Sequence, residues 1–276
     1  MNSFTDGLIA TNDTNMAAGY IAYWRLSSDS INGSQLLNAL ARRDIDENAP
    51  GMPTPRVALR RAMQKQAGGS LFVRKGPNGS ILLVEQDGDE FETFANAELN
   101  IGGQPVVTCP GSAALEEDVR DQYWAELDTL ASTDISSWLI REAAACDALS
   151  LRDTGGVYFI PAHKMERWEK LCAALHETTK CRVHNIPAMH TDNAVGAILD
   201  ALTEECEAFT QDMDTAMGDE TLGARALRGR ANKADAMIAK LQRYEDILGD
   251  KMSKISEQIQ EQSANAIMLA LTKEDN

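Results

Sequence analysis

The chain has 276 residues, of which 43% are hydrophobic and 25% charged, and its formal net charge is −16 at pH 7. This length suits one or two domains with a sizeable core. Because phosphate repels a net anion, the composition argues against general nucleic-acid binding through the field of the whole molecule. The sequence has no run of 18 apolar residues, so it offers no candidate membrane-spanning helix.

The N-terminus and the cysteines indicate a cytoplasmic protein. The opening residues, MNSFTDGLIATNDTNMAAG, lack the basic start and the long apolar stretch of a signal peptide. The five cysteines are an odd number and lie in apolar surroundings. This pattern favours reduced thiols over a framework of disulfides.

Charge is distributed unevenly along the chain. Residues 42–75 carry eight Lys or Arg and three Asp or Glu, whereas residues 81–134 carry one basic residue and thirteen acidic ones. Residues 191–220 carry nine acidic residues and no basic one. A local basic surface near the N-terminus is therefore compatible with the negative net charge of the whole chain.

The first 190 residues alternate strands and helices after a polar, flexible tail at 1–19. Thr54 and Pro55 are residue types favoured at the N-cap and the first position of a helix. Apolar runs flank the turns GPNG and DGD, which predicts an antiparallel meander. The predicted elements are, in chain order, a strand at 20–26, a helix at 34–43, a helix at 55–67, a meander at 70–94 with a further strand at 104–109, a helix at 112–131, a helix at 134–149 capped by Asp134, a strand at 155–161, a helix at 163–178 and a strand at 181–187.

These elements predict an α+β fold, an antiparallel sheet with packed helices, in a body at 20–190. The strand, helix and strand at 155–187 follow one another with short loops, which indicates a β-α-β-like unit added to the meander.

Residues 191–276 are predicted to form a C-terminal helical arm, because apolar side chains recur every three or four residues. A helical hairpin that turns at 217–220 and a long coiled coil between chains both fit this seam, and the acidic 191–220 complements basic residues at 225–233 in either case. Glu245 interrupts the seam and must be exposed, paired or protonated. We expect self-association through six aliphatic side chains, each contributing about 1.5–3 kcal/mol on burial. They are Leu227, Ile238, Leu241, Leu248, Ile255 and Ile259.

The helix at 55–67 carries basic side chains in rows four residues apart. Arg56, Arg60, Arg61 and Lys65 are candidate contacts for phosphate or nucleic acid, because arginine forks and helix N-termini both favour phosphate oxygens. Two other interpretations fit the same residues, a solvated helix face or a surface that docks an acidic stretch of the chain itself, and the net charge favours these two. Further basic residues lie close in sequence, at Arg42, Arg43, Arg74 and Lys75.

The stretch CAALHETTKCRVH is the one candidate zinc site. Cys172 and His176 share a face of the predicted helix, whereas Cys181 and His184 point to opposite faces of the predicted strand. The spacing matches no common zinc module, so we interpret the cysteines as structural and keep Cys172 and His176 as the candidate ligands. We expect no cofactor.

Other catalytic and ligand-binding patterns are weak or missing from the sequence. Asp87, Asp89 and Glu90 in the segment EQDGDE are candidate ligands for a divalent cation, but a hairpin turn explains this segment better. The motifs G-x-x-x-x-G-K-[ST], G-x-G-x-x-G, H-E-x-x-H and G-x-S-x-G do not occur. No catalytic residue is therefore nominated.

Four stretches carry a resemblance to a known family: IAYWRL, PTPRVALRRA, DTGGVYFIP and LGARALRGRANKADAMIAKLQRYEDILGDKM. Together they resemble an uncharacterised family carried by phages, plasmids and some prokaryotic genomes. The resemblance implies a mobile element and the cytoplasm of a prokaryotic cell or a phage-infected host. It implies no activity and no catalytic residue.

The sequence leads us to expect a non-enzymatic assembly or adaptor protein that associates with itself or with another protein. The long helical seam is the feature that favours this function. The first alternative is a nucleic-acid-associated regulator that uses the helix at 55–67. The second alternative is a metal-dependent hydrolase or nuclease that uses the acidic turn or the Cys/His stretch.

Overall fold

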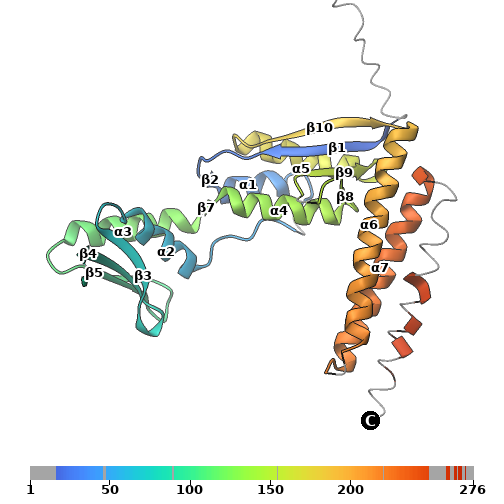
Figure 1. Cartoon of the computed structure of the whole chain (residues 1–276). Helices are drawn as coiled ribbons and strands as arrows, with labels where there is room; N and C mark the ends of the chain where they lie inside the picture. The colour runs from blue at the N-terminus through green and yellow to red at the C-terminus, as the bar shows by residue number, and fades with distance from the viewer. Residues whose placement is uncertain are drawn as a thin grey trace, which may run out of the picture. The chain divides into compact units, whose positions relative to one another are not determined.

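The computed structural model describes residues 17–45, 48–88, 90–153, 155–219 and 221–248, and also 259–261, 264, 265, 267, 268 and 271 (Figure 1). Contacts between residues divide the chain into two units. Unit 1 contains the described residues of 1–25, 142–169 and 183–276, and unit 2 contains those of 26–141 and 170–182. The tail predicted at 1–19 falls almost entirely outside the described residues, and the boundary predicted at residue 190 stays a prediction.

Unit 1 is built on a four-stranded sheet with the order β10-β1-β9-β8. β1 (Ala17–Arg25) pairs antiparallel with β9 (Val157–Pro161), which also pairs antiparallel with the short β8 (Leu149–Ser150). The helix α5 (Met165–Thr178) connects β9 to β10 (Arg182–Met189), and β1 lies between these two strands. This is a split β-α-β arrangement. The predicted β-α-β-like unit is thus present, but in a separate sheet from the meander.

Close packing of backbone and side chains explains why particular residue types occupy this sheet and the helix on it. A Cβ atom on Gly19 would lie 2.0 Å from the carbonyl oxygen of Ile160, so only glycine fits at this position of β1. Trp168 on α5 is fully buried, and its indole nitrogen donates to Asn185 Oδ1 on β10 over 2.9 Å. The buried indole is therefore satisfied, as is usual for tryptophan in a core.

Two long helices complete unit 1, α6 (Asp192–Met217) and α7 (Ala224–Leu248). They lie side by side and run in opposite directions (Figure 1). Thr191 caps α6 by accepting from the backbone N–H of Ala194. Their apolar faces and those of β1, β8, β9 and β10 form one buried cluster, which also includes Ile259.

α6 ends at Met217 and α7 begins at Ala224, close to the predicted turn, so 192–248 forms two helices rather than one continuous coil. Leu227, Leu241 and Leu248 are buried inside unit 1, and Ile238 packs against the same cluster. The predicted seam residue Ile255 lies outside the described residues. Burial within one chain thus accounts for the apolar seam without a second chain.

Polar contacts between the helices match the charge complementarity read from the sequence. Arg230 pairs with Asp212, and the Lys240 ammonium lies 2.8 Å from Glu205. Glu245, the charged residue that interrupts the apolar seam, is exposed. Tyr244 is buried in its place and donates its hydroxyl proton to the backbone oxygen of Asp147 over 2.7 Å.

The carboxylate of Asp147 joins α7 to the segment between α4 and β8. Arg243 donates to both of its oxygens, over 2.8 and 2.6 Å, and His163 Nε2 lies 3.1 Å from Oδ2. Burial opposes the charged form, but the hydrogen bonds from Arg243 and His163 and the charges of Arg243 and Lys164 more than offset it. The pKa of Asp147 is therefore lowered.

Unit 2 contains a meander with helices on it. The sheet order is β3-β4-β5-β6, and all three pairs are antiparallel, as predicted. Its strands are β3 (Leu71–Lys75), β4 (Ile81–Asp87), β5 (Glu90–Leu99) and β6 (Pro105–Thr108), and its helices are α2 (Pro55–Lys65) and α3 (Ala113–Leu127). The apolar cluster that joins them contains only residues from 58 to 127. We call residues 54–127 the meander module.

The rest of unit 2 includes α1 (Gly33–Ala41) and a two-stranded ribbon of β2 (Ile31–Asn32) and β7 (Thr129–Leu130). α4 (Ser132–Ala145) begins two residues earlier than predicted. Asp134 lies in its first turn and accepts from the backbone N–H of Ala131, which corrects its predicted role as N-cap.

No helix in the described ranges is long and apolar enough to cross a membrane.

We expect Asp147→Asn to lower the free energy of unfolding at pH 7 by about 1–3 kcal/mol, because the charged hydrogen bonds to Arg243 are lost. Asparagine tolerates the positive φ of 56° at this position, so the backbone need not change. An aspartate with a lowered pKa in the folded state stabilises it above about pH 4, and this contribution disappears as the pH falls through the folded value. The difference between the two proteins should therefore shrink below about pH 4.

Urea unfolding at a series of pH values measures this difference. Asp153→Asn is the matched control, because Asp153 is exposed in the same unit. An equal effect of both substitutions at neutral pH would contradict the role given to Asp147.

Candidate functional site

The helix α2 presents basic side chains on both flanks of its apolar face. Ala58, Leu59, Ala62 and Met63 are buried in the cluster of the meander module. With 3.6 residues per turn, this face places the row of Arg56 and Arg60 on one flank and the row of Arg61 and Lys65 on the other. The four residues nominated from the sequence therefore form two separate pairs.

The second pair, Arg61 and Lys65, forms ion pairs within unit 2. Arg61 donates to the backbone oxygen of Thr129 over 3.0 Å and to Asp134 Oδ2 over 2.8 Å. The ammonium of Lys65 lies 2.6 Å from Glu126 Oε1. Because the Glu126 side chain is only 5% exposed, it needs this cation to compensate its burial. Arg61 and Lys65 thus have structural roles. They fit the interpretation that the basic helix face docks acidic residues of the chain itself.

The first pair lines a pocket of about 340 Å³. Arg74 and Lys75 at the end of β3 also line it, and as consecutive residues of a strand they direct their side chains to opposite faces of the sheet. None of the four cations forms an ion pair within the part of the chain that the structure describes, and no carboxylate there lines the pocket. The lining residues are Arg56, Arg60, Val73, Arg74, Lys75, Ser80 and Ile81.

A tight turn between β3 and β4 shapes one wall of the pocket. Gly79 has φ of +84°, which favours glycine, and a Cβ atom there would lie 3.4 Å from the Arg56 guanidinium. The turn therefore supports Arg56 through close approach. It corresponds to the GPNG sequence from which the hairpin was predicted.

Ser80 is the polar residue at the base of this turn. Its side chain is buried, with 4% exposure of the residue, and its Oγ has no hydrogen-bond partner. A Cβ atom on Gly76 would lie 2.3 Å from this oxygen, so glycine leaves the hydroxyl its space. A buried hydroxyl without a partner is unusual in native proteins and unfavourable unless a ligand or water satisfies it.

Arg74 is held from a second side. Its guanidinium carbon lies 3.7 Å from the centre of the Phe91 ring on β5, a cation–π contact. The ring itself is 45% exposed. The contact holds the guanidinium over β5 without neutralising its charge.

This arrangement suits an anion with several oxygen atoms. Arginine forks donate two parallel hydrogen bonds to phosphate, and lysine adds a point charge. Cations without ion pairs that lie close together repel one another, and an anion removes that repulsion. The pocket is therefore a candidate phosphate-binding site.

The other basic residues noted from the sequence lie elsewhere in unit 2. Arg42 and Arg43 each contact a carboxylate oxygen of Glu177, both over 2.6 Å. Sequence reasoning noted Arg74 and Lys75 but did not join them to α2.

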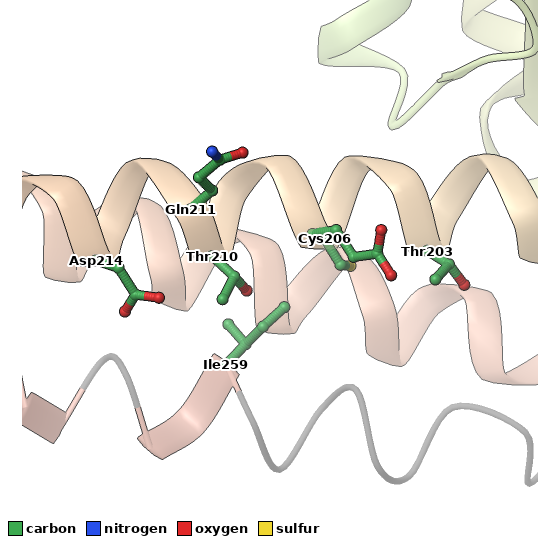
Figure 2. A pocket seen from close by; sticks show the side chains of 7 residues that line it. Thr203, Cys206, Thr210, Gln211, Asp214 and Ile259 are labelled. Atoms are coloured by element: carbon green, nitrogen blue, oxygen red, sulfur yellow. The ribbon is translucent and has the colours of Figure 1, made fainter.

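A second pocket, of about 250 Å³, lies along α6 in unit 1. The Ile259 side chain points toward α6 near Thr210, and Cys206 and Asp214 also line the pocket (Figure 2). Burial, aided by the charge of Glu205, raises the pKa of the Cys206 thiol to about 12. The thiol is therefore protonated at neutral pH and a poor nucleophile.

In the described part of the chain, the candidate metal ligands are not joined by enough other ligand side chains to form a metal site. Within the described ranges, no group of three or more His, Cys, Asp and Glu side chains is placed to hold a metal ion. Cys172 is buried on α5, in keeping with a structural cysteine, and His176 is half-buried on the same helix. Asp87 and Glu90 pair across the β4–β5 hairpin, and Asp89 lies outside the described residues.

The neighbours Arg60 and Arg61 provide a test of the two rows. Arg61→Ala should lower the free energy of unfolding by about 1–2 kcal/mol, because Asp134 and the Thr129 oxygen lose their donor. Arg60→Ala should leave it within about 0.5 kcal/mol, because an exposed side chain without an ion pair is removed. Thermal or urea unfolding of the two variants measures the difference, and equal destabilisation would contradict the division.

Neither the search of curated proteins nor that of solved structures found a match. The sequence model of one family, described as a family of unknown function (DUF6744), matches residues 18–275. Because this match spans nearly the whole chain, the protein belongs to the DUF6744 family.

Proposed function

We propose that the chain is a nucleic-acid-associated protein that binds phosphate groups at the pocket between α2 and the β3–β4 turn. The observation that carries this proposal is that Arg56, Arg60 and Lys75 line one pocket without an ion pair or a carboxylate among the described lining residues. The resemblance to a family carried by phages and plasmids makes a mobile element the expected setting.

The acidic total of the chain does not preclude such binding. At physiological ionic strength the Debye length is about 8 Å, so a phosphate in the pocket responds mainly to the charges beside it. Few phosphates fit next to so small a basic surface. We therefore expect weak to moderate affinity and a shallow dependence on salt, about −0.7 in log K per log salt for each phosphate contacted on a single strand.

Binding of a labelled single-stranded oligonucleotide over a salt series tests the proposal. Replacing Arg56 and Arg60 together by alanine should weaken binding at every salt concentration and reduce the slope by about 1.4, the share of two phosphate contacts. The matched control replaces Arg152 and Arg225, two exposed arginines of unit 1, and changes the net charge equally. Equal losses in both double variants, or no binding at low salt, would refute the proposal.

A second candidate function is the assembly or adaptor role expected from the sequence. The seam residues Leu227, Leu241, Leu248 and Ile259 are buried in their own chain, so this role needs another surface. Ile267, Met268 and Leu271 supply one candidate, because these three apolar side chains are exposed within five residues of one another. Exposed apolar side chains that lie together can form an interface with another chain.

Light scattering of the full chain tests this second candidate. If the patch mediates self-association, replacing Met268 and Leu271 together by aspartate should reduce the mass in solution to that of one chain. Asn265→Asp, an exposed position in the same segment, should leave the mass unchanged. A wild-type protein that is monomeric at micromolar concentration would rule out self-association through these residues.

A further inference from the structure

We infer that the face of the β3–β6 sheet opposite α2 and α3 binds the bases of a single-stranded nucleic acid, which stack on Phe72 and Phe91. We call this side of the sheet the open face. The inference rests on the proposed function, and it adds the kind of strand and a second set of contacts to the phosphate contacts of the pocket.

The strand register places both phenylalanines on the open face. Val73 packs against the apolar cluster of α2 and α3, so the side chain of the adjacent Phe72 points to the opposite side. Phe72 pairs with Val84 of β4. Phe91 of β5 pairs with Gln86, two residues after Val84. Directly paired residues share a face, as do residues two apart on one strand, so the two rings lie on the same side of the sheet.

Both rings are accessible from solvent and offer flat apolar surfaces. Each phenylalanine is 45% exposed, although this residue type is among those most often buried. The Arg74 guanidinium carbon lies 3.7 Å from the centre of the Phe91 ring, so a third flat group lies beside them. Unpaired bases stack on aromatic rings and on arginine guanidinium planes. In a duplex the bases are occupied by pairing and by stacking on one another, so this surface suits a single strand.

The cations beside the open face select a nucleic acid over an apolar protein segment. β3 is an edge strand, and the basic pocket is lined both by Arg74 on the open face and by Lys75 on the side of α2. Lys75 follows Phe72 by three residues, about 10 Å at the rise of a strand. A strand whose phosphate groups lie in the pocket therefore reaches the open face with its neighbouring bases. An apolar protein segment carries no group that these cations would bind.

The carboxylates of the sheet limit the length of strand that can bind. Glu85 pairs with Leu71, which packs against the apolar cluster, so Glu85 points to the side of α2. Glu92 pairs with Glu85 and shares that side. Glu98 is exposed on the open face near β6, because the adjacent Ala97 is buried in the cluster. The open face is therefore favourable around the two phenylalanines and unfavourable toward β6, so a few nucleotides fit best.

The test compares two labelled oligonucleotides of the same length, an intact single strand and a strand of abasic sites, which has the same phosphate groups but no bases. Fluorescence anisotropy with the full chain over a salt series measures both affinities. The intact strand should bind at least about fivefold more tightly, the lower limit for one base stacked on an aromatic side chain. A duplex that contains the same strand forms a third arm.

Phe72→Leu is the decisive variant, because leucine keeps an apolar side chain but has no flat ring. It should weaken binding of the intact strand about fivefold or more at every salt concentration and leave the salt slope unchanged, because stacking involves no phosphate. Its affinity for the abasic strand and for the duplex should not change, and Phe72→Trp should keep the affinity for the intact strand. Trp124→Leu is the matched control, because Trp124 is an exposed aromatic residue on α3 of the same module. A thermal melt of each variant confirms its fold.

The outcomes separate this inference from the proposed function. Equal binding of the intact and abasic strands, an affinity unchanged in Phe72→Leu, or an equal loss in Trp124→Leu overturns the stacking inference and leaves the phosphate pocket standing. Loss of binding in Phe72→Leu with no effect of replacing Arg56 and Arg60 supports the open face and overturns the pocket. Absence of binding to all three nucleic acids overturns both. A mass in solution above that of one chain that falls in Phe72→Leu, with strand binding unchanged, overturns the inference and assigns the open face to a second copy of the chain.

Discussion

The packing of α2 against the β3–β6 sheet is the constraint on which the proposed site depends. Ala58, Leu59, Ala62 and Met63 supply a single apolar face, and burying that face leaves no freedom to rotate the helix about its axis. Arg56 and Arg60 are thereby directed to one flank, beside the β3–β4 turn, and Arg61 and Lys65 to the other. A slip of one residue would rotate the helix by about 100° and carry one of the two basic rows into the apolar interface.

The local parts of the fold follow from the sequence because their causes are local. Thr54 and Pro55 start α2, the GPNG turn joins β3 to β4, and the glycine-containing segment after Met217 separates α6 from α7. The arrangement of the four-stranded sheet of unit 1 and of the two-stranded ribbon of unit 2 depends instead on contacts between distant segments. β8 and β7 are two residues long, too short for any periodic pattern to reveal, and the insertion of β1 between β9 and β10 is decided by packing.

The partners of the seam and site residues could not be predicted from the sequence, because they lie far away along the chain. Tyr244 rather than Glu245 enters the core, because its hydroxyl finds the backbone oxygen of Asp147 nearly a hundred residues earlier. The i, i+4 spacing of α2 predicted both basic rows but could not show that Glu126 and Asp134 neutralise one of them. Charge counts along the sequence likewise could not reveal that Arg56 and Arg60 share a pocket with Lys75 of β3.

The most direct measurement of the central claim is the position of a bound anion. Tungstate resembles phosphate in charge and shape and has a strong anomalous X-ray signal, so crystals of the full chain soaked in it would locate each anion site. The account predicts an anomalous peak within hydrogen-bonding distance of the Arg56 and Arg60 guanidinium groups. Peaks only at other basic residues, such as Arg225, with an ordered but empty pocket would contradict it.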